Sequence, residues 1–382
     1  MSKISIIGGG ITGLTTAIGL EQAGYETEVF EAAPAFKPSG AGIIISPNAM
    51  QVLTSFGLAK DVQQAGKSID ALRLAKTNGS IMQTAAMQFD GIGSVGIHRG
   101  KLHEILLANL KSDVCFGKRL TNISDGENGI HLEFNGDEKQ TADVVLAADG
   151  IHSAMRQTLF PKSQLRDSGQ VCWRGVSDNT AVGEFAGSLP VEIWGAGQRM
   201  GIVPLADDQT YWYATDVLAS DPITLDDAAE KEHLLNVFAD FPAPTLELIK
   251  AVPAEKILRH RLNDLAPIPQ WHTGSILLLG DAAHAMTPNL GQGAAQGIVD
   301  AWTIVGCIKG RATINEAFEQ FVALRQKEVN QVVAQCWQIG KVTNIRSSWL
   351  SGLRNSTLSL VPASVGDRGR RKLFALPNLS RK

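Results

Sequence analysis

Residues 3–31, which decide the fold of this chain, read KISIIGGGITGLTTAIGLEQAGYETEVFE. A short apolar strand enters a glycine-rich turn, a helix follows, and a second strand ends in an acid, Glu31. In this βαβ pattern Gly8 permits the tight turn, Gly10 lets the backbone approach a pyrophosphate, and Gly13 lets helix and strand pack closely. The helix amino terminus offers unpaired N–H groups to the phosphates.

Glu31 indicates which dinucleotide binds. A carboxylate at this position accepts hydrogen bonds from a ribose diol and repels a 2′-phosphate. The stretch therefore predicts a site for FAD or NAD rather than NADP; the alternative is a βαβ turn with a structural role alone.

Length and composition narrow the class of protein. The 382 residues are enough for two or three domains, and a formal net charge of −3 gives no electrostatic reason to expect nucleic acid as a partner. The 4 cysteines are scattered, which favours buried thiols over a metal cluster or a redox pair. Because the sequence shows neither a signal-peptide pattern nor an apolar run of about 18 residues, we expect a cytoplasmic protein without stable membrane association.

Two further predicted strands end in acids. Residues 143–146 lead into Asp149 and Gly150, and residues 275–279 lead into Gly280 and Asp281. Ligands of open α/β sheets bind at the carboxyl ends of the strands, so the repeated acids favour one shared site over unrelated turns.

Two other features surround these acids. Arg99 stands at a predicted helix start, where a cation is unfavourable unless an anion lies near; this indicates a phosphate or flavin contact, with a solvated surface arginine as the alternative. His284 follows Asp281, and we expect it to be a packed histidine bonded to the backbone.

The middle of the chain changes pattern. Asn78-Gly79 between apolar segments predicts a hairpin, and short strands rich in Trp, Tyr and Val between residues 171 and 261 predict an antiparallel sheet. Helices are expected at 226–238 and 244–252 against this sheet, and at 316–337 further along.

The carboxyl-terminal tail is basic. From residue 346 only Asp367 opposes the cations, which are Arg346, Arg354, Arg368, Arg370, Arg371, Lys372, Arg381 and Lys382. Such a tail forms either a membrane-surface patch or an amphipathic cover across a domain interface, and we favour the cover.

Three motifs occur in order: Gly8-x-Gly10-x-x-Gly13 with Glu31, LAADGIHSAMR at 146–156, and LLLGDAAH at 277–284. Together they resemble the single-component, FAD-dependent aromatic hydroxylases, the p-hydroxybenzoate hydroxylase-like monooxygenases, over nearly the whole chain. CWRG at 172–175 and GQGAAQ at 291–296 are similar to the salicylate, 3-hydroxybenzoate and urate hydroxylase branch.

The resemblance implies an α/β fold with three parts. A discontinuous Rossmann-like FAD-binding domain would comprise residues 1–70, 98–165 and 270–335. A substrate domain with a mixed antiparallel sheet would comprise residues 71–97 and 166–269, and a helical tail would comprise residues 336–382.

The resemblance also implies roles for individual residues. Those assigned to FAD are Glu31 for the adenosine ribose, Arg99 for the phosphate or ribityl region, Asp149 and Gly150 for the pyrophosphate and the nicotinamide cofactor, Asp281 for the ribityl chain or pyrophosphate, and Pro288, Gly291 and Gly293 for the isoalloxazine ring. Arg199 would anchor a carboxylate or enolate of the substrate, with a strand-edge surface arginine as the alternative. Arg199 and Pro288 would form the catalytic environment, and no metal is required.

The implied activity is hydroxylation of a small aromatic or heteroaromatic compound, through a flavin C4a-hydroperoxide formed from noncovalent FAD, O2 and NADPH or NADH. A monomer or homodimer is expected. The alternatives are a monooxygenase for a larger polycyclic substrate of the tetracycline-inactivating type, an epoxidase, and a non-catalytic FAD-binding redox sensor.

Overall fold

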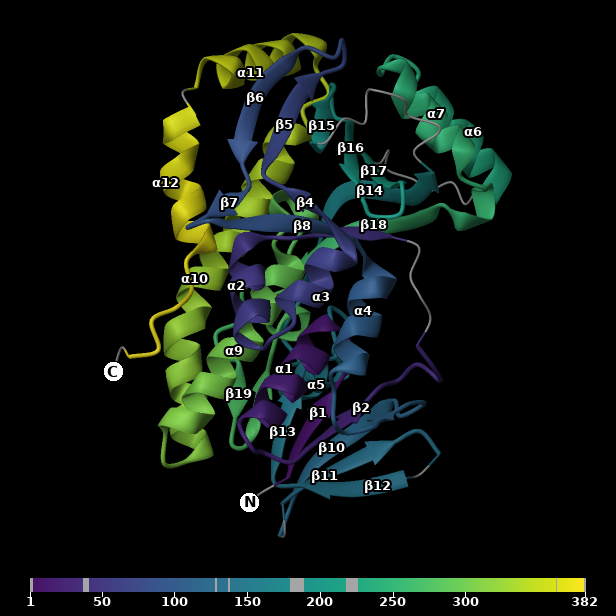
Figure 1. Cartoon of the computed structure of the whole chain (residues 1–382). Helices are drawn as coiled ribbons and strands as arrows, with labels where there is room; N and C mark the ends of the chain where they lie inside the picture. Colours follow the sequence, from purple (N-terminus) through teal and green to yellow (C-terminus); the bar gives the residue numbers. More distant parts are fainter. Residues whose placement is uncertain are drawn as a thin grey trace.

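The structure, a computed structural model, describes residues 3–36, 41–127, 129–136, 138–178, 189–217, 226–361 and 363–380 (Figure 1). Arg381 and Lys382 of the predicted basic tail lie outside these ranges. The strands are β1 (Ile4–Ile7), β2 (Thr27–Phe30), β3 (Gly42–Ile45), β4 (Gly66–Ile69), β5 (Ala71–Lys76), β6 (Ile81–Ala86), β7 (Gln88–Phe89), β8 (Ile92–His98), β9 (Val114–Cys115), β10 (Leu120–Gly126), β11 (Gly129–Phe134), β12 (Glu138–Ala142), β13 (Val144–Ala147), β14 (Leu165–Asp178), β15 (Val191–Trp194), β16 (Arg199–Pro204), β17 (Gln209–Val217), β18 (Leu258–Leu265), β19 (His272–Thr273) and β20 (Ile276–Leu278). The helices are α1 (Ile11–Gln22), α2 (Pro47–Ser55), α3 (Ala59–Gln64), α4 (Arg99–Ala108), α5 (Ala154–Leu159), α6 (Asp227–Val237), α7 (Ala243–Ala251), α8 (Asp281–His284), α9 (Gly293–Gly310), α10 (Ile314–Thr343), α11 (Ser348–Leu360) and α12 (Ala363–Phe374), with short 3-10 turns η3 (Ala254–Lys256) and η4 (Pro288–Leu290).

A six-stranded sheet in the order β19-β20-β13-β1-β2-β9 carries the predicted βαβ unit. Strands β20, β13, β1, β2 and β9 run parallel, and β19 is antiparallel at the edge. In this register Ile4 lies opposite Val144 on one side and Thr27 on the other. Because these strands are parallel, their carboxyl ends share one edge of the sheet.

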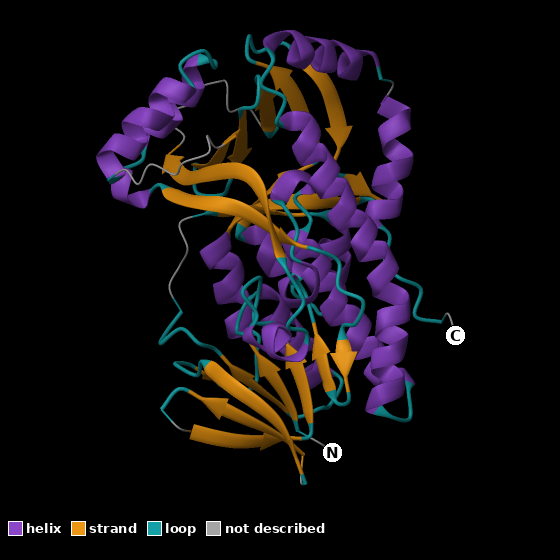
Figure 2. Cartoon of the chain, turned by 180° about the vertical axis from the view of Figure 1, so that it is seen from behind, coloured by secondary structure: helices purple, strands orange, loops and turns teal. Residues whose placement is uncertain are grey.

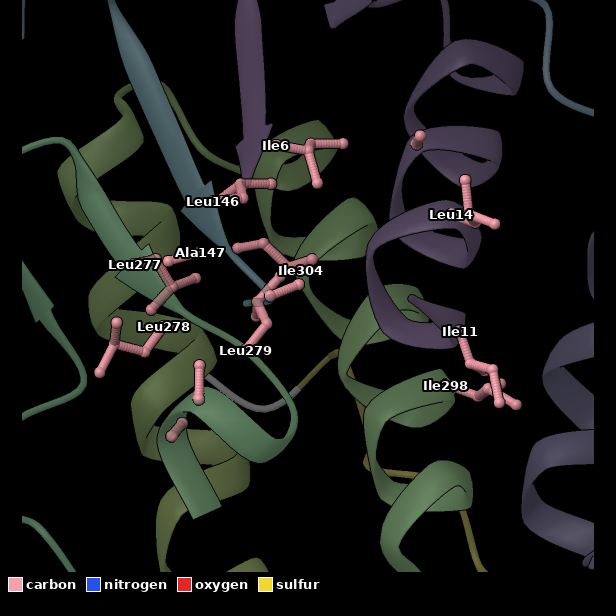
Figure 3. Packing of buried hydrophobic residues seen from close by; sticks show 14 of the residues in the cluster. Ile6, Ile11, Leu14, Leu146, Ala147, Leu277, Leu278, Leu279, Ile298 and Ile304 are labelled. Carbon is pink, nitrogen blue, oxygen red and sulfur yellow. The ribbon is translucent and has the colours of Figure 1, made fainter. Parts of the chain in front are cut away.

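The core of this sheet follows from its apolar strands. Every residue of β1 is buried, which is the pattern of a parallel strand covered on both faces. Figure 3 shows side chains of β1, β13 and β20, among them Ile6 and Leu146, gathered near Ile304 of α9. Helices α1 and α9 pack closely, and a Cβ added at Gly297 would clash with Thr12.

A seven-stranded sheet in the order β18-β14-β17-β16-β15-β5-β6 forms the second layer. Its neighbours are antiparallel except β15 and β5, which are parallel. The predicted hairpin at Asn78-Gly79 is the β5–β6 connection, and helices α6 and α7 pack on the sheet through Leu234 and Leu248. The α/β class with a mixed antiparallel second sheet is thus confirmed.

Two smaller sheets complete the fold: β3, β8 and β4 with β7, and β10-β11-β12. The sheet memberships support the three-part division of the chain, which remains our proposal.

The helix expected at 316–337 is longer than predicted, because α10 continues to Thr343 and so crosses the proposed boundary at 336.

The last three helices cover one side of the molecule. Helices α10 and α12 run along one flank, and α11 lies across the end of the molecule above β5 and β6 (Figures 1 and 2). Within the described ranges, no helix combines the length and the apolar character needed to cross a bilayer.

Candidate active site

The three strand-end acids lie along one edge of the parallel sheet. Glu31 directly follows β2, while Asp149 and Asp281 come shortly after β13 and β20. Only β1, which leads into the glycine turn, separates β2 from β13, and β20 is the next neighbour of β13. The structure therefore brings to one edge the acids that the sequence predicted to act together.

The glycine turn fills the middle of this edge. Gly8 has a φ of +108°, and a Cβ there would clash with the carbonyl of Ala148. A Cβ at Gly13 would clash with the carbonyl of Gly8, whereas a Cβ at Gly10 meets no atom within 4 Å. Gly8 and Gly13 are thus required by the chain's own packing, and Gly10 leaves open space beside the backbone.

A cavity of about 450 Å³ opens beside this turn, and Gly10, Glu31, Arg99 and His103 line it. Asp149 and Asp281 do not line this cavity. The Glu31 carboxylate accepts hydrogen bonds from the N–H groups of Gly9 and Ala33, both at 2.8 Å. These bonds fix the carboxylate, and its remaining lone pairs stay available to a ligand hydroxyl.

Arg99 and Asp281 form an electrostatic pair on this edge. Arg99 is the first residue of α4, and both residues have solvent-accessible surface although many protein atoms surround their charged groups. Loss of hydration lowers the pKa of Arg99, and the negative charge of Asp281 acts in the opposite direction. Burial likewise raises the pKa of Asp281, which His284 and Arg99 oppose. The cation at the helix start therefore has an acid nearby, which its position on the helix required.

Asp149 has a hydrogen-bond acceptor without a partner. Its Oδ2 accepts a bond from the Met155 N–H at 3.2 Å, whereas Oδ1 is buried and accepts no hydrogen bond of regular geometry among the described residues, although the Ser153 side chain lies near the carboxyl. Burial raises the pKa of this carboxyl. Gly150 beside it has a φ of +80° and open space around its Cβ position. A ligand hydroxyl that reached this oxygen would supply a donor.

Two residues at this edge were given no role from the sequence. His103 Nε2 lies 2.6 Å from the carbonyl of Gly9, and its position four residues after Arg99 on one helix was an available signal. Arg156 is 2% exposed and donates hydrogen bonds to the carbonyls of Ala282 and Ile151. It thereby ties together the segments that follow β13 and β20.

Asp300 holds the turn before Asp281 from behind. Its Oδ2 accepts a bond from the Gly280 N–H at 2.9 Å and lies 2.6 Å from His284 Nε2, while Oδ1 accepts from Arg325 Nε at 2.7 Å. Burial alone would raise the pKa of Asp300, but His284 and Arg325 outweigh it and lower the pKa to about 2. The expectation that His284 bonds to the backbone is wrong, because a buried carboxylate offers its ring a stronger acceptor.

Arg199 belongs to the seven-stranded sheet and is 3% exposed, so it is not a surface arginine. Its Nη1 donates to Glu192 Oε1 at 3.1 Å, and its Nη2 donates to Asn289 Oδ1. Asn289 is the neighbour of Pro288 in η4, so Arg199 reaches the segment that leads to α9. The two predicted catalytic residues therefore lie in one region.

The segment from Pro288 to α9 returns to the strand-end edge. Gly291 ends η4 with a φ of +62°, and a Cβ at Gly293, the first residue of α9, would lie 3.9 Å from Asp281 Oδ1. The amino terminus of α9 is therefore adjacent to Asp281.

No three His, Cys, Asp or Glu side chains in the described part of the chain are grouped as a metal site requires.

Comparison with known proteins agrees with this geometry. A family described as "FAD binding domain" matches residues 1–336. The chain belongs to this family. It is 33% identical over 381 residues to the aurachin C monooxygenase/isomerase of Stigmatella aurantiaca, covering 98% of each chain. It is 31% identical over 380 residues to the 2-heptyl-3-hydroxy-4(1H)-quinolone synthase of Pseudomonas aeruginosa, covering 97% of each.

A solved structure shares the fold. Klebsiella pneumoniae HpxO, complexed with FAD and uric acid, superposes with a TM-score of 0.90 at 24% identity, covering 98% of this chain and 97% of that one. The resemblance to the FAD-dependent aromatic hydroxylases is confirmed, and the chain is a flavoprotein monooxygenase of this family with FAD as its cofactor.

Proposed function

We propose that the chain hydroxylates a 4-quinolone that carries an alkyl chain, with NADH or NADPH as hydride donor and O2 as oxygen source. The quinolone class is supported by the similarity, over nearly the full length of both chains, to a relative whose name states a 2-heptyl-3-hydroxy-4(1H)-quinolone product. We infer that this chain hydroxylates the same ring carbon, C3, that bears the hydroxyl group in the named product.

The strand-end edge fits FAD. The unpartnered Oδ1 of Asp149 and the open space at Gly10 are the two features that a bound dinucleotide would satisfy. Glu31 would accept bonds from the adenosine ribose, Arg99 would neutralise phosphate charge, and Asp281 would bind the ribityl chain or pyrophosphate. We propose that Asp149 and Gly150 bind the pyrophosphate of FAD and also contact the nicotinamide cofactor.

FAD, when bound and reduced, supplies the activation of O2 that no side chain provides. The amino terminus of α9 at Gly293 would stabilise negative charge on a reduced flavin ring through its unpaired N–H groups and its dipole. The buried face of the seven-stranded sheet would exclude water from the reacting atoms.

The observation that favours a neutral over an anionic substrate is the ion pair of Arg199. The Arg199 and Glu192 side chains are only 4% and 10% exposed, and Glu192 already compensates the positive charge. A substrate carboxylate would have to compete with Glu192, whereas a neutral ring carbonyl accepts a bond from Arg199 without adding a charge. This geometry favours a quinolone carbonyl over the carboxylate of a hydroxybenzoate.

The test is oxidation of NADH and of NADPH by the FAD-loaded protein, with hydrogen peroxide measured beside product. 2-Heptyl-4(1H)-quinolone should stimulate oxidation and gain one oxygen atom, while salicylate, urate and tetracycline should stimulate it weakly. Turnover of urate, salicylate or tetracycline in place of the quinolone would contradict the substrate class. Oxidation that no aromatic compound stimulates would favour a redox sensor.

A further inference from the structure

Helix α11 has its polar and apolar faces reversed. Four of its five large apolar side chains are exposed to solvent, namely Trp349 (72%), Leu350 (45%), Leu353 (53%) and Leu360 (82%), while Leu358 is partly buried. The buried residues of the same helix are Ser351 and Asn355. A helix on the surface of a globular domain normally packs its apolar stripe against the core. Here that stripe faces outward.

Hydrogen bonds hold the helix in this orientation. Asn355 Nδ2 donates to the carbonyl of Trp194 at 3.5 Å, and Arg354 Nη2 donates to the carbonyl of Gly195 at 2.8 Å. From β6, Gln83 Nε2 donates to the carbonyl of Leu358 at 2.9 Å. The polar face is thus used for attachment to the seven-stranded sheet, and the apolar face is left free.

The exposed side chains form a narrow ridge. Leu353 and Leu360 follow Trp349 by four and eleven residues, which places all three within an arc of about 40° on a helix of 3.6 residues per turn. Leu350 lies beside this arc. Because α11 lies across one end of the molecule (Figures 1 and 2), the ridge projects from the surface.

The chain on either side of the ridge is basic, although Arg346 also lies near the carboxylate of Asp216. Between Glu328 and Asp367 the sequence contains no acid, whereas Lys341, Arg346 and Arg354 fall in this interval. Lys341 and Arg346 are exposed. In a chain with a net charge of −3, this combination of basic and apolar residues is a local feature.

We propose that α11 docks reversibly on the surface of a bilayer that contains anionic phospholipid, with Trp349, Leu353 and Leu360 inserted at the headgroup level. Interfacial helices combine such an apolar face with cations that attract anionic lipid. A second copy of the chain fits less well, since a standard protein interface needs about 800 Å² from each partner and a ridge one helix wide offers little flat surface.

Docking would bring the substrate side of the protein to the membrane. The opposite face of α11 is bonded to β15, where Trp194 pairs with Arg199 of β16. An apolar substrate dissolved in the bilayer would then be close to the sheet that carries Arg199. The docking itself does not depend on the proposed substrate.

The experiment is flotation of the FAD-loaded full chain with vesicles of phosphatidylcholine alone or mixed equally with phosphatidylglycerol. The wild type should float with the mixed vesicles, and less so at high salt. The triple variant Trp349→Ser, Leu353→Ser, Leu360→Ser should lower the ratio of bound to free protein at least about tenfold. Lys341→Gln with Arg346→Gln should weaken binding to the mixed vesicles only.

Leu165→Ser is the matched control, because Leu165 is an exposed apolar residue, 36% exposed, on β14. It should float like the wild type, and all variants should keep the flavin spectrum and melting temperature of the wild type. Failure of the wild type to float with anionic vesicles, or equal flotation of the triple variant, would overturn the proposal. A dimer that the triple variant breaks, without flotation of either protein, would assign the ridge to a second copy instead.

Discussion

The edge of the parallel sheet and the region around Arg199 differ in whether their charged groups are accessible to a ligand or paired within the chain. At the edge, Arg99 and Asp281 are exposed and Asp149 keeps an unpartnered oxygen. Around Arg199 the cation is buried and bonded to Glu192 and Asn289. The first region leaves charged and polar groups for a charged cofactor, whereas the second has its charge balanced within the chain. This difference is the basis of our proposal that the first region binds FAD and the second a neutral ring.

The largest expected effect is a loss of stability when Asp300, which holds the Gly280 turn, is replaced. Asp300→Ala removes the partner of two buried groups, Arg325 and His284, and leaves the Arg325 cation without compensation. We expect a loss of about 3–5 kcal/mol in the free energy of unfolding of the apoprotein, together with weaker FAD binding. Urea unfolding measures the first effect. A loss below about 1 kcal/mol would show that the bonds of Asp300 to Gly280, His284 and Arg325 are not needed to hold the Gly280 turn.

A pair of glycine substitutions separates packing from cofactor binding within the edge. Gly13→Ala should destabilise the apoprotein by about 1–3 kcal/mol, because its Cβ would clash with the Gly8 carbonyl. Gly10→Ala should leave apoprotein stability nearly unchanged and weaken FAD, since its Cβ enters open space beside the turn. Thermal unfolding with and without FAD distinguishes the two. Equal loss of apoprotein stability in both variants would contradict the assignment of open space to the cofactor.

Much of the edge was predictable from the sequence because its signals are local. The turn from Gly8 to Gly13 and the acid after each strand are short motifs, and parallel pairing brings their ends together. The partners of Arg199 were not predictable, because Glu192 lies across a strand pair and Asn289 belongs to another part of the fold. The direction of α11 also depends on bonds to distant residues such as Trp194.

The stability of the protein should depend on pH through the buried carboxylate of Asp300. Asp300 has a folded-state pKa of about 2, below its ordinary value of 3.8. A depressed carboxyl pKa stabilises the fold above the unfolded value, and this contribution is lost as pH falls from about 4 through 2. We expect roughly 2 kcal/mol of stability to disappear in this range and to be missing in Asp300→Asn. Parallel unfolding curves of the two proteins against pH would contradict this origin.

The smallest expected effect concerns the Arg199–Glu192 ion pair, which we propose lies beside the substrate. Glu192→Gln should leave the Arg199 cation uncompensated, so that salicylate, a competing carboxylate, binds about tenfold more tightly. Inhibition of NAD(P)H oxidation by salicylate measures this change. Glu230→Gln is a matched control, because Glu230 pairs with a different arginine, Arg259, on the same sheet. Unchanged salicylate inhibition in Glu192→Gln would remove the argument for a neutral substrate.

Titration of the apoprotein with FAD, followed by flavin fluorescence, tests most directly whether the strand ends hold the cofactor. We expect one FAD per chain, a Kd at least about tenfold weaker in Asp281→Ala, and a Kd within about twofold of the wild type in Arg199→Ala. Absence of FAD binding, or equal weakening in the two variants, would contradict it.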